Sequence, residues 1–407
     1  MAVATFGSTC SPASAQYIKN LNAEECSKEF PRAALAIKNK HYVDDYLDSF
    51  RTIKEAIEVV NEVKLVHSLG GFTLRHFLSN DAEVLEGICA TPTLEPKSMD
   101  LERGDKSESV LGKKWIPRDD VFVYMLGLRE DLEYIIAKDH IPTKGEIARV
   151  IMSMFDHLGF IAFFLVHGKI LLQDTWAKGI EWDQRIPDDI NARWQQWSNL
   201  FQQLDNLRIP RCYFRSPIPE SFSGLQLHLF VDASESAYAC AVYFRLETDT
   251  GTQVSLVGAK TKVAPLKTLS IPRLELKAAV LGVRLLNTIQ NQHEFPICRR
   301  YCWSDSGTVL AWIRSDDHRR FHKFVGVRIG EILTSTVPSE WKWVPTKLNV
   351  ADLATKWGTG PQLTMDNTWF QGPFFIHDSE DKWPQQRPSL PTVEELRPAH
   401  LHLVCSI

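Results

Sequence analysis

Alternating apolar and polar positions in the stretch HLFVDASESAYACAVYFR predict two strands joined by a tight polar turn. Leu227, Leu229 and Val231 lie on one alternation, and residues 238–244 make a second β-rich run. Asp232 stands at the end of the first strand, where the fold itself requires no carboxylate. The structural explanation is an aspartate that opens a serine-containing turn, and a functional explanation requires further acidic residues later in the chain.

The pattern after this hairpin predicts a mixed α/β domain. Period-two runs indicate three further strands, over 253–263, 300–303 and 340–344. Helical spacing indicates four helices, over 269–292, 306–313, 321–335 and 349–356. Pro272 fits the first turn of the first of these helices, and Ser306 is placed to cap the second.

The pattern before residue 221 predicts a mostly helical chain with short strands. The expected elements are a helix over 52–68, a strand over 72–77, a hairpin over 110–124 and helices between 143 and 204. Thr143 and Glu146 form a capping-box pattern. Trp194 and Trp197 share one helix face, and core packing explains them better than a base-stacking platform does.

Proline-rich segments predict the connections. Residues 209–220 contain three prolines and predict a linker. Beyond Trp357 the chain has Gly-Pro pairs, further prolines and few periodic apolar residues, which predicts a partly ordered tail. No internal repeat is visible.

Composition limits the functional classes. The 407 residues allow two to four domains, and the net charge of −4 gives no bulk argument for nucleic-acid binding, so local basic patches would have to provide it. No secretory signal is visible, and the most apolar run, Phe160–Val166, is too short to cross a bilayer. We therefore expect an intracellular protein, not secreted and without a membrane partner, that keeps its eight cysteines reduced. Cys298 and Cys302 with His293 form only a weak zinc pattern, because no second ligand pair follows.

Two adjacent aspartates in the stretch KHYVDDYLDSF predict a hairpin turn that carries carboxylates. Asp44 and Asp45 repel each other unless a cation neutralises them, which favours a divalent metal. A solvated turn is the alternative for Asp-Asp taken alone.

Four carboxylates occupy the ends of predicted elements in the C-terminal half. They are Asp232 on a strand, Glu275 in the expected first turn of a helix, Asp305 at a strand end and Asp352 at a helix start. Each alone has a structural explanation, such as an interaction of Glu275 with the helix dipole. Together in one site they would repel strongly without counter-charge. Two Mg²⁺ ions about 4 Å apart would supply that charge and activate water against a phosphodiester.

The motifs around these acids resemble a known family. FVDAS, IPRLEL, WSDS and NVADLA, in this order, resemble the ribonuclease H domain of BEL/Pao-type LTR retrotransposon pol polyproteins. The resemblance implies a five-stranded mixed sheet flanked by helices and cleavage of the RNA strand in RNA–DNA hybrids. It also implies two Mg²⁺ (or Mn²⁺) ions held by Asp232, Glu275, Asp305 and Asp352.

The N-terminal half resembles other parts of the same polyproteins. FGSTCSPASA, YVDD, GGFTLRHFLSN and VLGKKW resemble segments of the reverse-transcriptase palm, and PTKGEIARVIMSMFDHLGF, KILLQDTW and IPRCYF resemble the region before ribonuclease H. In FDHLG, His157 replaces the proline that is usual in the family.

The resemblance divides the chain into four parts. They are a reverse-transcriptase palm over 1–135, a helical thumb or connection region with a linker over 136–220, a ribonuclease H-like domain over 221–358 and a proline-containing tail towards an integrase over 359–407. The fold class expected is therefore α/β and α+β multidomain. The fingers and the first catalytic strand, which lie upstream of FGSTCSP in the family, are not in this sequence. We therefore expect Asp44 and Asp45 to be a polymerase remnant that does not synthesise DNA alone.

The expected partner is an RNA–DNA hybrid or another nucleic acid, with other pol fragments as further candidates. Phosphate contacts would come from a cationic cluster that precedes Glu275 and comprises Lys260, Lys262, Lys267 and Arg273. A solvated edge explains these side chains equally well. The resemblance places the protein in cytoplasmic virus-like particles or in the nucleus.

Two other functions remain open. Asp305-Ser306-Gly307 matches the signature of aspartic peptidases, although the helix-like TVLAWIRS occurs where a peptidase would have a flap. A degenerate or host-retained copy could instead serve only as a non-catalytic protein that binds nucleic acid or partners.

Overall fold

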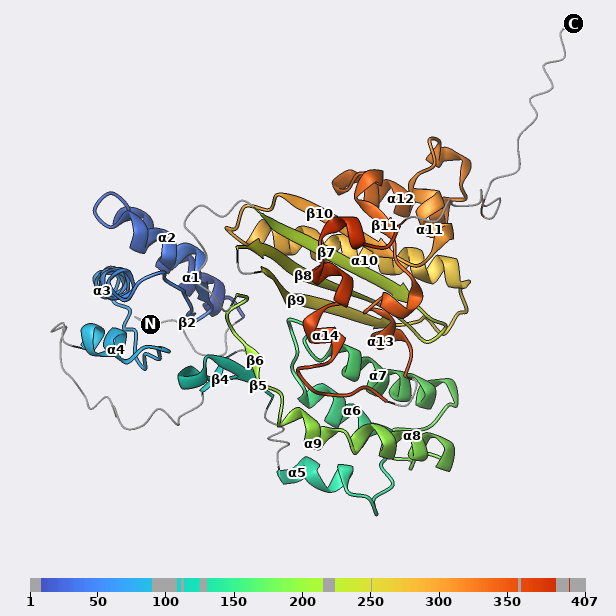
Figure 1. Cartoon of the computed structure of the whole chain (residues 1–407). Helices are drawn as coiled ribbons and strands as arrows, with labels where there is room; N and C mark the ends of the chain where they lie inside the picture. The colour runs from blue at the N-terminus through green and yellow to red at the C-terminus, as the bar shows by residue number, and fades with distance from the viewer. Residues whose placement is uncertain are drawn as a thin grey trace, which may run out of the picture. The chain divides into compact units, whose positions relative to one another are not determined.

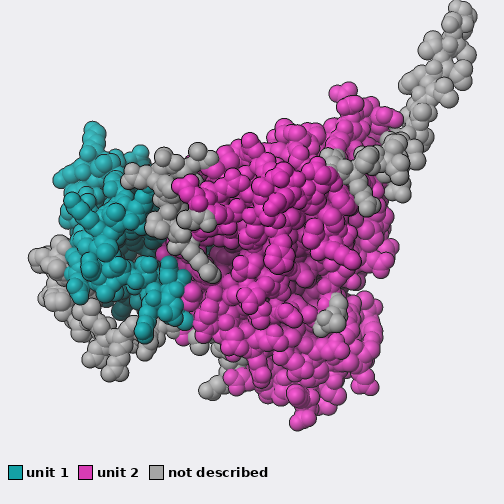
Figure 2. Space-filling model, viewed as in Figure 1, with its two compact units in different colours: residues 1–108, 115–120 teal, residues 109–114, 121–407 magenta. Residues whose placement is uncertain are grey.

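The computed structural model describes residues 9–89, 108–110, 113–124, 130–214, 224–249, 251–357, 360–385 and 395. The chain divides into two compact units, which are described separately (Figure 2). The first comprises residues 1–108 and 115–120, and the second comprises residues 109–114 and 121–407.

The first unit is built from helices around a small apolar core. Its helices are α1 (Ser11–Glu25), α2 (Pro31–Asn39), α3 (Ile53–Leu69) and α4 (Ala82–Cys89), with the hairpin β1 (His41–Tyr42) and β2 (Asp45–Tyr46) between α2 and α3. Thr52 caps α3 by accepting a hydrogen bond from the amide of Glu55, so the predicted helix is confirmed. The strand predicted over 72–77 is wrong, because these residues form no regular element after the break at Gly70.

Short elements connect the larger ones. They are β3 (Glu108–Val110), β4 (Lys113–Ile116), the 3₁₀ turn η1 (Pro117–Asp119), β5 (Val121–Val123), α5 (Glu130–Glu133) and η2 (Tyr134–Ile136). Asp120 has a positive φ of 50°, which fits the turn predicted at this point.

The second unit contains a five-stranded mixed sheet. Its strands are β7 (Leu225–Ala233), β8 (Ala237–Thr248), β9 (Gly251–Val263), β10 (Arg299–Ser304) and β11 (Trp341–Trp343), in the order β11-β10-β7-β8-β9. β7, β8 and β9 form an antiparallel meander, and β10 pairs in parallel with β7 and β11. All five strands predicted for this domain are confirmed, with bounds that move by a few residues.

The long helix α10 (Ile271–Gln292) covers one face of the sheet (Figure 1). Leu227, Leu229 and Val231 point into this face, where Leu276 and Val283 of α10 meet them in one apolar core. α11 (Gly307–Ile313), η3 (His318–Arg320), α12 (Lys323–Ser335) and η4 (Pro338–Glu340) come after α10 and β10. Ser306 accepts a hydrogen bond from the amide of Val309, which confirms the predicted cap of α11.

A helical layer covers the opposite face. It consists of α6 (Lys144–Ser153), α7 (Ala162–Ala177), α8 (Asp188–Ser198) and α9 (Phe201–Leu204), followed by β6 (Ile209–Pro210), which pairs with β5. The predicted capping box of Thr143 and Glu146 opens α6. Trp194 and Trp197 are buried, and Trp197 stacks on Phe164 with ring centroids 4.9 Å apart. Their predicted role in core packing is confirmed.

A tight loop joins the helical layer to the edge of the sheet. The carbonyl of Leu158 accepts a hydrogen bond of 2.9 Å from the amide of Ala259 in β9. Gly159 has a φ of 79°, and a Cβ there would lie 1.8 Å from the carbonyl oxygen of Ala259. Only glycine permits both the conformation and this close approach. The loop thereby covers part of the edge strand.

The segment 360–385 closes the second face, although the sequence predicts a partly ordered tail there. It contains α14 (Thr368–Gln371), η6 (Phe374–His377) and η7 (Glu380–Lys382) and comes after η5 (Thr346–Leu348) and α13 (Asp352–Thr355). Trp369, Ile376 and Trp383 are buried against the sheet. The proline and glycine content marked the turns but did not reveal the aromatic side chains as core residues.

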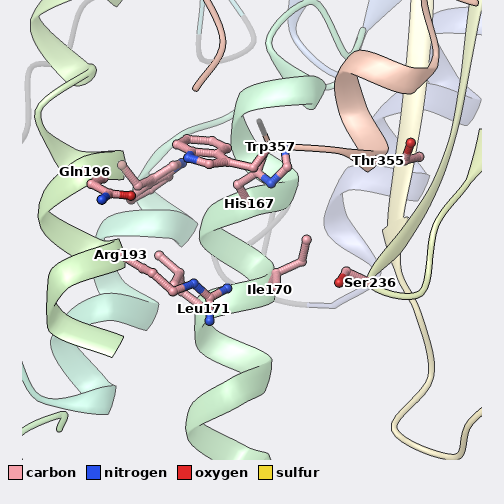
Figure 3. A pocket seen from close by; sticks show the side chains of 9 residues that line it. His167, Ile170, Leu171, Arg193, Gln196, Ser236, Thr355 and Trp357 are labelled. Carbon is pink, nitrogen blue, oxygen red and sulfur yellow. The ribbon is translucent and has the colours of Figure 1, made fainter. Parts of the chain in front are cut away.

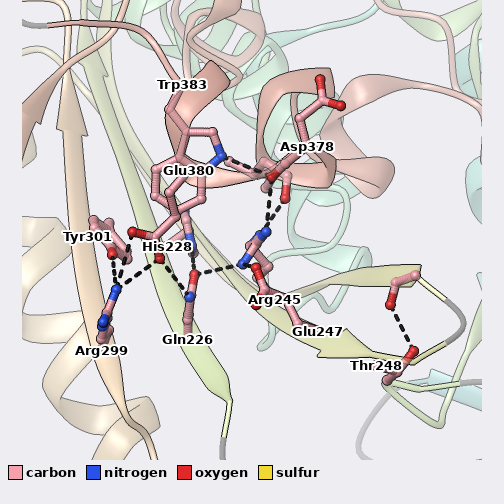
Figure 4. Close-up of polar contacts among 12 residues, drawn as sticks. Gln226, His228, Arg245, Glu247, Thr248, Arg299, Tyr301, Asp378, Glu380 and Trp383 are labelled. Atoms are coloured by element: carbon pink, nitrogen blue, oxygen red, sulfur yellow. Dashed lines mark hydrogen bonds and ion pairs between the residues drawn. The ribbon is translucent and has the colours of Figure 1, made fainter.

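A buried arginine holds this segment to the sheet (Figure 4). Arg245 of β8 is fully buried and donates to the carbonyl oxygens of Ile376 and Asp378 at 2.6 and 2.9 Å and to Gln226 at 3.1 Å. Glu247 pairs with it at 2.6 Å. Since a buried guanidinium needs partners for its donors, these contacts fix where the segment crosses the sheet.

Among the described residues, no helix is both long and apolar enough to cross a membrane.

Candidate active site

Two aspartates meet at the ends of neighbouring parallel strands. Asp232 lies near the end of β7, and Asp305 comes directly after β10, whose last residue, Ser304, is in register with Val231. This register places the two carboxylates at the same edge of the sheet. Asp232 is only 4% exposed, so the chain holds an acidic side chain almost out of water.

Two helices bring the other predicted acids. Glu275 belongs to α10, and Ser306 donates a hydrogen bond to its carboxylate. The expectation that Glu275 lies in the first helical turn is wrong, because α10 begins at Ile271 and Glu275 is its fifth residue. Asp352 is the first residue of α13, as predicted.

Electrostatic coupling connects the four acids. Burial, together with the charges of Asp305 and Asp352, raises the pKa of Asp232 to about 7. Burial, together with the charge of Asp305, also raises the pKa of Glu275. A raised pKa is what a carboxyl group acquires when it is removed from water and placed next to like charges. The charge of Asp305 therefore acts on both Asp232 and Glu275, and the charge of Asp352 acts on Asp232.

Neutral donors orient these carboxylates. Thr355 donates its hydroxyl hydrogen bond to Asp232, and Thr346 donates to Asp305 at 2.7 Å. The amide of Asn349 donates to the carbonyl oxygen of Val231 at 2.9 Å and to Asp305 at 3.3 Å. The segment from η5 to α13 thus connects both strand ends.

Lys356 supplies a positive charge to the cluster. Its ammonium group donates to Asp352, and the nearby charges of Asp352, Asp232 and Asp305 raise its pKa against the effect of burial. The site predicted from the sequence did not include Lys356 or Thr355, and Ser306 was predicted only as a helix cap. All three lie within or beside the motifs NVADLA and WSDS, so attention to the polar neighbours of each acid would have found them.

The donor set fits a divalent metal by its chemistry. Carboxylate oxygens are the ligands that Mg²⁺ prefers, and burial, with like charges nearby, raises the pKa of Asp232 and Glu275. Within the described residues, however, no three or more His, Cys, Asp or Glu side chains are grouped closely enough to hold an ion. Lys356 and Thr355 occupy carboxylate oxygens instead, so metal binding would have to replace their hydrogen bonds.

The other acidic motif lies on an exposed hairpin. Asp44, in the turn between β1 and β2, and Asp45, the first residue of β2, are exposed, and the predicted hairpin is confirmed. Val43, in the same turn, has a φ of 55°, which is unusual for a β-branched residue.

The predicted phosphate-binding residues lie in different environments. Lys260, Lys262 and Lys267 are exposed on or just after β9. Arg273 of α10 instead holds both carboxylate oxygens of Glu395, at 2.6 and 2.8 Å. The lysines are therefore accessible to a phosphate, whereas Arg273 would first have to release Glu395.

The zinc pattern has no geometric support in the described residues. Cys302 is fully buried in β10, whereas Cys298 is exposed, and His293 lies 3.1 Å from the hydroxyl of Tyr213. The peptidase signature leads directly into a helix, since α11 begins at Gly307.

Comparison with known proteins identifies one domain. Residues 143–306 match the family described as Pao retrotransposon-like RNaseH-like domain. No curated protein matches the chain. Ribonuclease H1 from the halophilic archaeon Halobacterium salinarum is a similar solved structure, with 17% sequence identity over 32% of this chain and 91% of that chain and a TM-score of 0.21.

The matched residues extend from the helical layer to β10 and include Asp232, Glu275 and Asp305. Residues 143–306 are therefore similar to the Pao retrotransposon-like RNaseH-like domain, the type that the motifs around Asp232, Glu275 and Asp305 resemble.

Proposed function

We propose that the second unit cleaves the RNA strand of RNA–DNA hybrids with two divalent cations, Mg²⁺ or Mn²⁺. The observation that carries this proposal is the buried Asp232 near the end of β7, with Asp305 directly after the neighbouring parallel strand β10, where burial and the charges of Asp305 and Asp352 raise the pKa of Asp232 to about 7. Buried like charges lower the stability of the folded protein. A cation that binds between them explains this arrangement better than a structural role does.

Each residue has a distinct task in this proposal. Asp232, Glu275, Asp305 and Asp352 would hold the metal ions, which when bound activate water and stabilise the leaving oxygen. Ser306, Thr346 and Asn349 orient the carboxylates through the hydrogen bonds described above. When no metal is bound, Thr355 donates a hydrogen bond to Asp232, and Lys356 compensates the charge of Asp352.

Substrate binding would depend on the exposed lysines of β9 and its following turn. Lys260 and Lys262 lie two residues apart on an edge strand, and their side chains are exposed. Contacts of this kind neutralise phosphates and position a duplex without reading its sequence. We therefore expect binding that weakens with salt.

The test is a labelled hybrid incubated with the purified chain and Mg²⁺. Cleavage of the RNA strand, with no cleavage of double-stranded DNA, supports the proposal. Binding of the hybrid without cleavage under any divalent metal would instead support the non-catalytic function.

We further propose that the first unit has no DNA polymerase activity in this chain. Asp44 and Asp45 stand exposed on a short hairpin, whereas two-metal phosphoryl transfer requires carboxylates held together from more than one element. Primer extension by the purified chain would contradict this.

A further inference from the structure

A polar cavity of about 140 Å³ lies beside the acidic cluster, within the second unit (Figure 3). Arg193 and Gln196 of α8 line one side, and Ser236 and Thr355 line the other, with His167 of α7 between them. Trp357, just after α13, completes the wall. The family match and the motifs assign none of these residues a role.

The cavity is connected to the proposed catalytic carboxylates through Thr355. The hydroxyl of Thr355 donates to Asp232, while its carbonyl oxygen accepts a hydrogen bond of 2.8 Å from Ser234. Ser234 and Ser236 belong to the turn after β7. A strand whose phosphate reaches Asp232 therefore has its neighbouring nucleotides close to this cavity.

One buried ring in the wall, which is hydrogen-bonded to the backbone of Leu353, has a second nitrogen without a partner among the described residues. His167 is 8% exposed, and its Nε2 atom accepts or donates no hydrogen bond within the described part of the chain. Burial lowers the pKa of His167 to about 4, so the ring is neutral at pH 7 and offers a donor or an acceptor there. Buried polar atoms are nearly always hydrogen-bonded, so this nitrogen favours a polar neighbour over an apolar one.

The remaining wall favours a flat, polar ring over an ion. The indole of Trp357 packs edge-on to His167, with ring centroids 4.3 Å apart. Gln196 and Ser236 are exposed and offer an amide and a hydroxyl. Arg193 is already paired with Asp174 at 2.6 Å, which reduces its attraction for an anion. The volume is close to that of cavities of about 150 Å³ that accept one benzene ring.

We propose that this cavity takes one unpaired nucleobase of the strand bound at the acidic cluster, stacked on Trp357 and hydrogen-bonded by Gln196, Ser236 or His167. The inference rests on the proposed function, because it requires a nucleic-acid substrate. It assigns the helical layer a direct part in substrate binding.

The test measures binding of three labelled hybrids by fluorescence anisotropy, in chelator, so that the result does not depend on cleavage. The first kind of hybrid is blunt. The second carries three unpaired thymidines at one end of one strand, and each of the four possible ends is tested in turn. The third carries the same overhangs without bases. Wild-type protein should bind at least one thymidine overhang about tenfold more tightly than its abasic counterpart. Trp357→Ala should remove this difference, and Trp357→Phe should retain most of it.

Control variants separate this effect from loss of structure. Trp182 is a half-exposed tryptophan outside the cavity, so Trp182→Ala should leave the difference unchanged. Gln196→Ala, at an exposed position, should reduce the difference in affinity between thymidine and abasic overhangs, and this holds even if Trp357→Ala folds poorly. If the thymidine and abasic overhangs bind equally tightly while the blunt hybrid still binds, the inference about the cavity is overturned and the proposed function is not. Absence of binding to every hybrid would overturn the proposed function as well.

Discussion

Burial and the charges of neighbouring acids oppose the ionisation of the Asp232 carboxyl group. Its pKa rises from 3.8 to about 7 because it is buried beside Asp305 and Asp352. The folded state therefore holds this proton more tightly than the unfolded state does. The contribution to stability is complete below pH 3.8 and is lost as the pH rises through about 7.

Asp232→Asn should consequently stabilise the metal-free protein at alkaline pH. We expect a gain in the free energy of unfolding on the order of 2–4 kcal/mol at pH 8, which shrinks towards zero below pH 4. Urea unfolding in chelator at several pH values measures it. The exposed Glu235→Gln, in the adjacent turn, is the matched control and should change little. An Asp232→Asn variant less stable than wild type at pH 8 would contradict the account.

Lys356 should compete with the metal. Its side chain is 54% exposed and donates to Asp352, so its electrostatic contribution is modest, about 1 kcal/mol at most. Lys356→Met should therefore lower the Mg²⁺ concentration for half-maximal binding about fivefold. Calorimetric Mg²⁺ titration measures this, with the exposed Lys323→Met as control. Weaker Mg²⁺ binding by Lys356→Met would show that the lysine helps to build the site.

At the residue scale, the sequence revealed the acids but not the groups that hold them. Asp232 and Asp305 could be predicted because each ends an apolar strand, where the fold needs no carboxylate. The hydrogen bonds of Thr355 and Thr346 could not, because they join residues 123 and 41 positions apart in the chain. Such contacts depend on the register of β7 with β10 rather than on local pattern.

At the scale of elements, periodicity predicted the sheet well and the last segment poorly. β7, β8 and β9 are long β-rich runs, and their bounds differ little from the expectation. Residues 360–385 have only short elements, so no periodic pattern could form. Their order comes from tertiary contacts, such as the hydrogen bonds from Arg245 to two of their carbonyl groups.

Trp369 should therefore be a major source of stability. It is fully buried, its indole nitrogen donates to the carbonyl oxygen of Phe160 at 2.9 Å, and its own carbonyl oxygen accepts from Tyr243 at 2.7 Å. Trp369→Ala should lower the free energy of unfolding by about 3–5 kcal/mol. Urea denaturation measures this loss.

The same segment provides a matched control. Phe374 is 80% exposed, so Phe374→Ala should change the free energy of unfolding by less than about 0.5 kcal/mol. Equal effects of the two substitutions would mean that residues 360–385 do not pack on the sheet.

On the scale of the second unit, the helical layer and the sheet share one apolar core. Phe163 and Phe164 of α7 belong to the same cluster as Ala241 and Tyr243 of β8. The domain boundary expected near residue 220 therefore does not separate two independent cores. A sequence cannot show this, because each layer has its own hydrophobic pattern.

This shared core predicts cooperative opening. Trp197→Ala, in the helical layer, should accelerate hydrogen exchange at the amides of both α7 and β8 by a similar factor. Hydrogen exchange followed by mass spectrometry measures it. Acceleration confined to α7 and α8 would show that the layer opens independently of the sheet.

The central claim is that the acidic cluster is a nuclease site, and hybrid cleavage by matched variants tests it most directly. Wild type and Glu235→Gln should cleave the RNA strand of a labelled hybrid in Mg²⁺ at similar rates, and chelator should abolish the reaction. Asp232→Asn should reduce the rate at least about a hundredfold while binding the hybrid as tightly as wild type. Equal cleavage by wild type and Asp232→Asn, or no cleavage by wild type in Mg²⁺ or Mn²⁺, would contradict it.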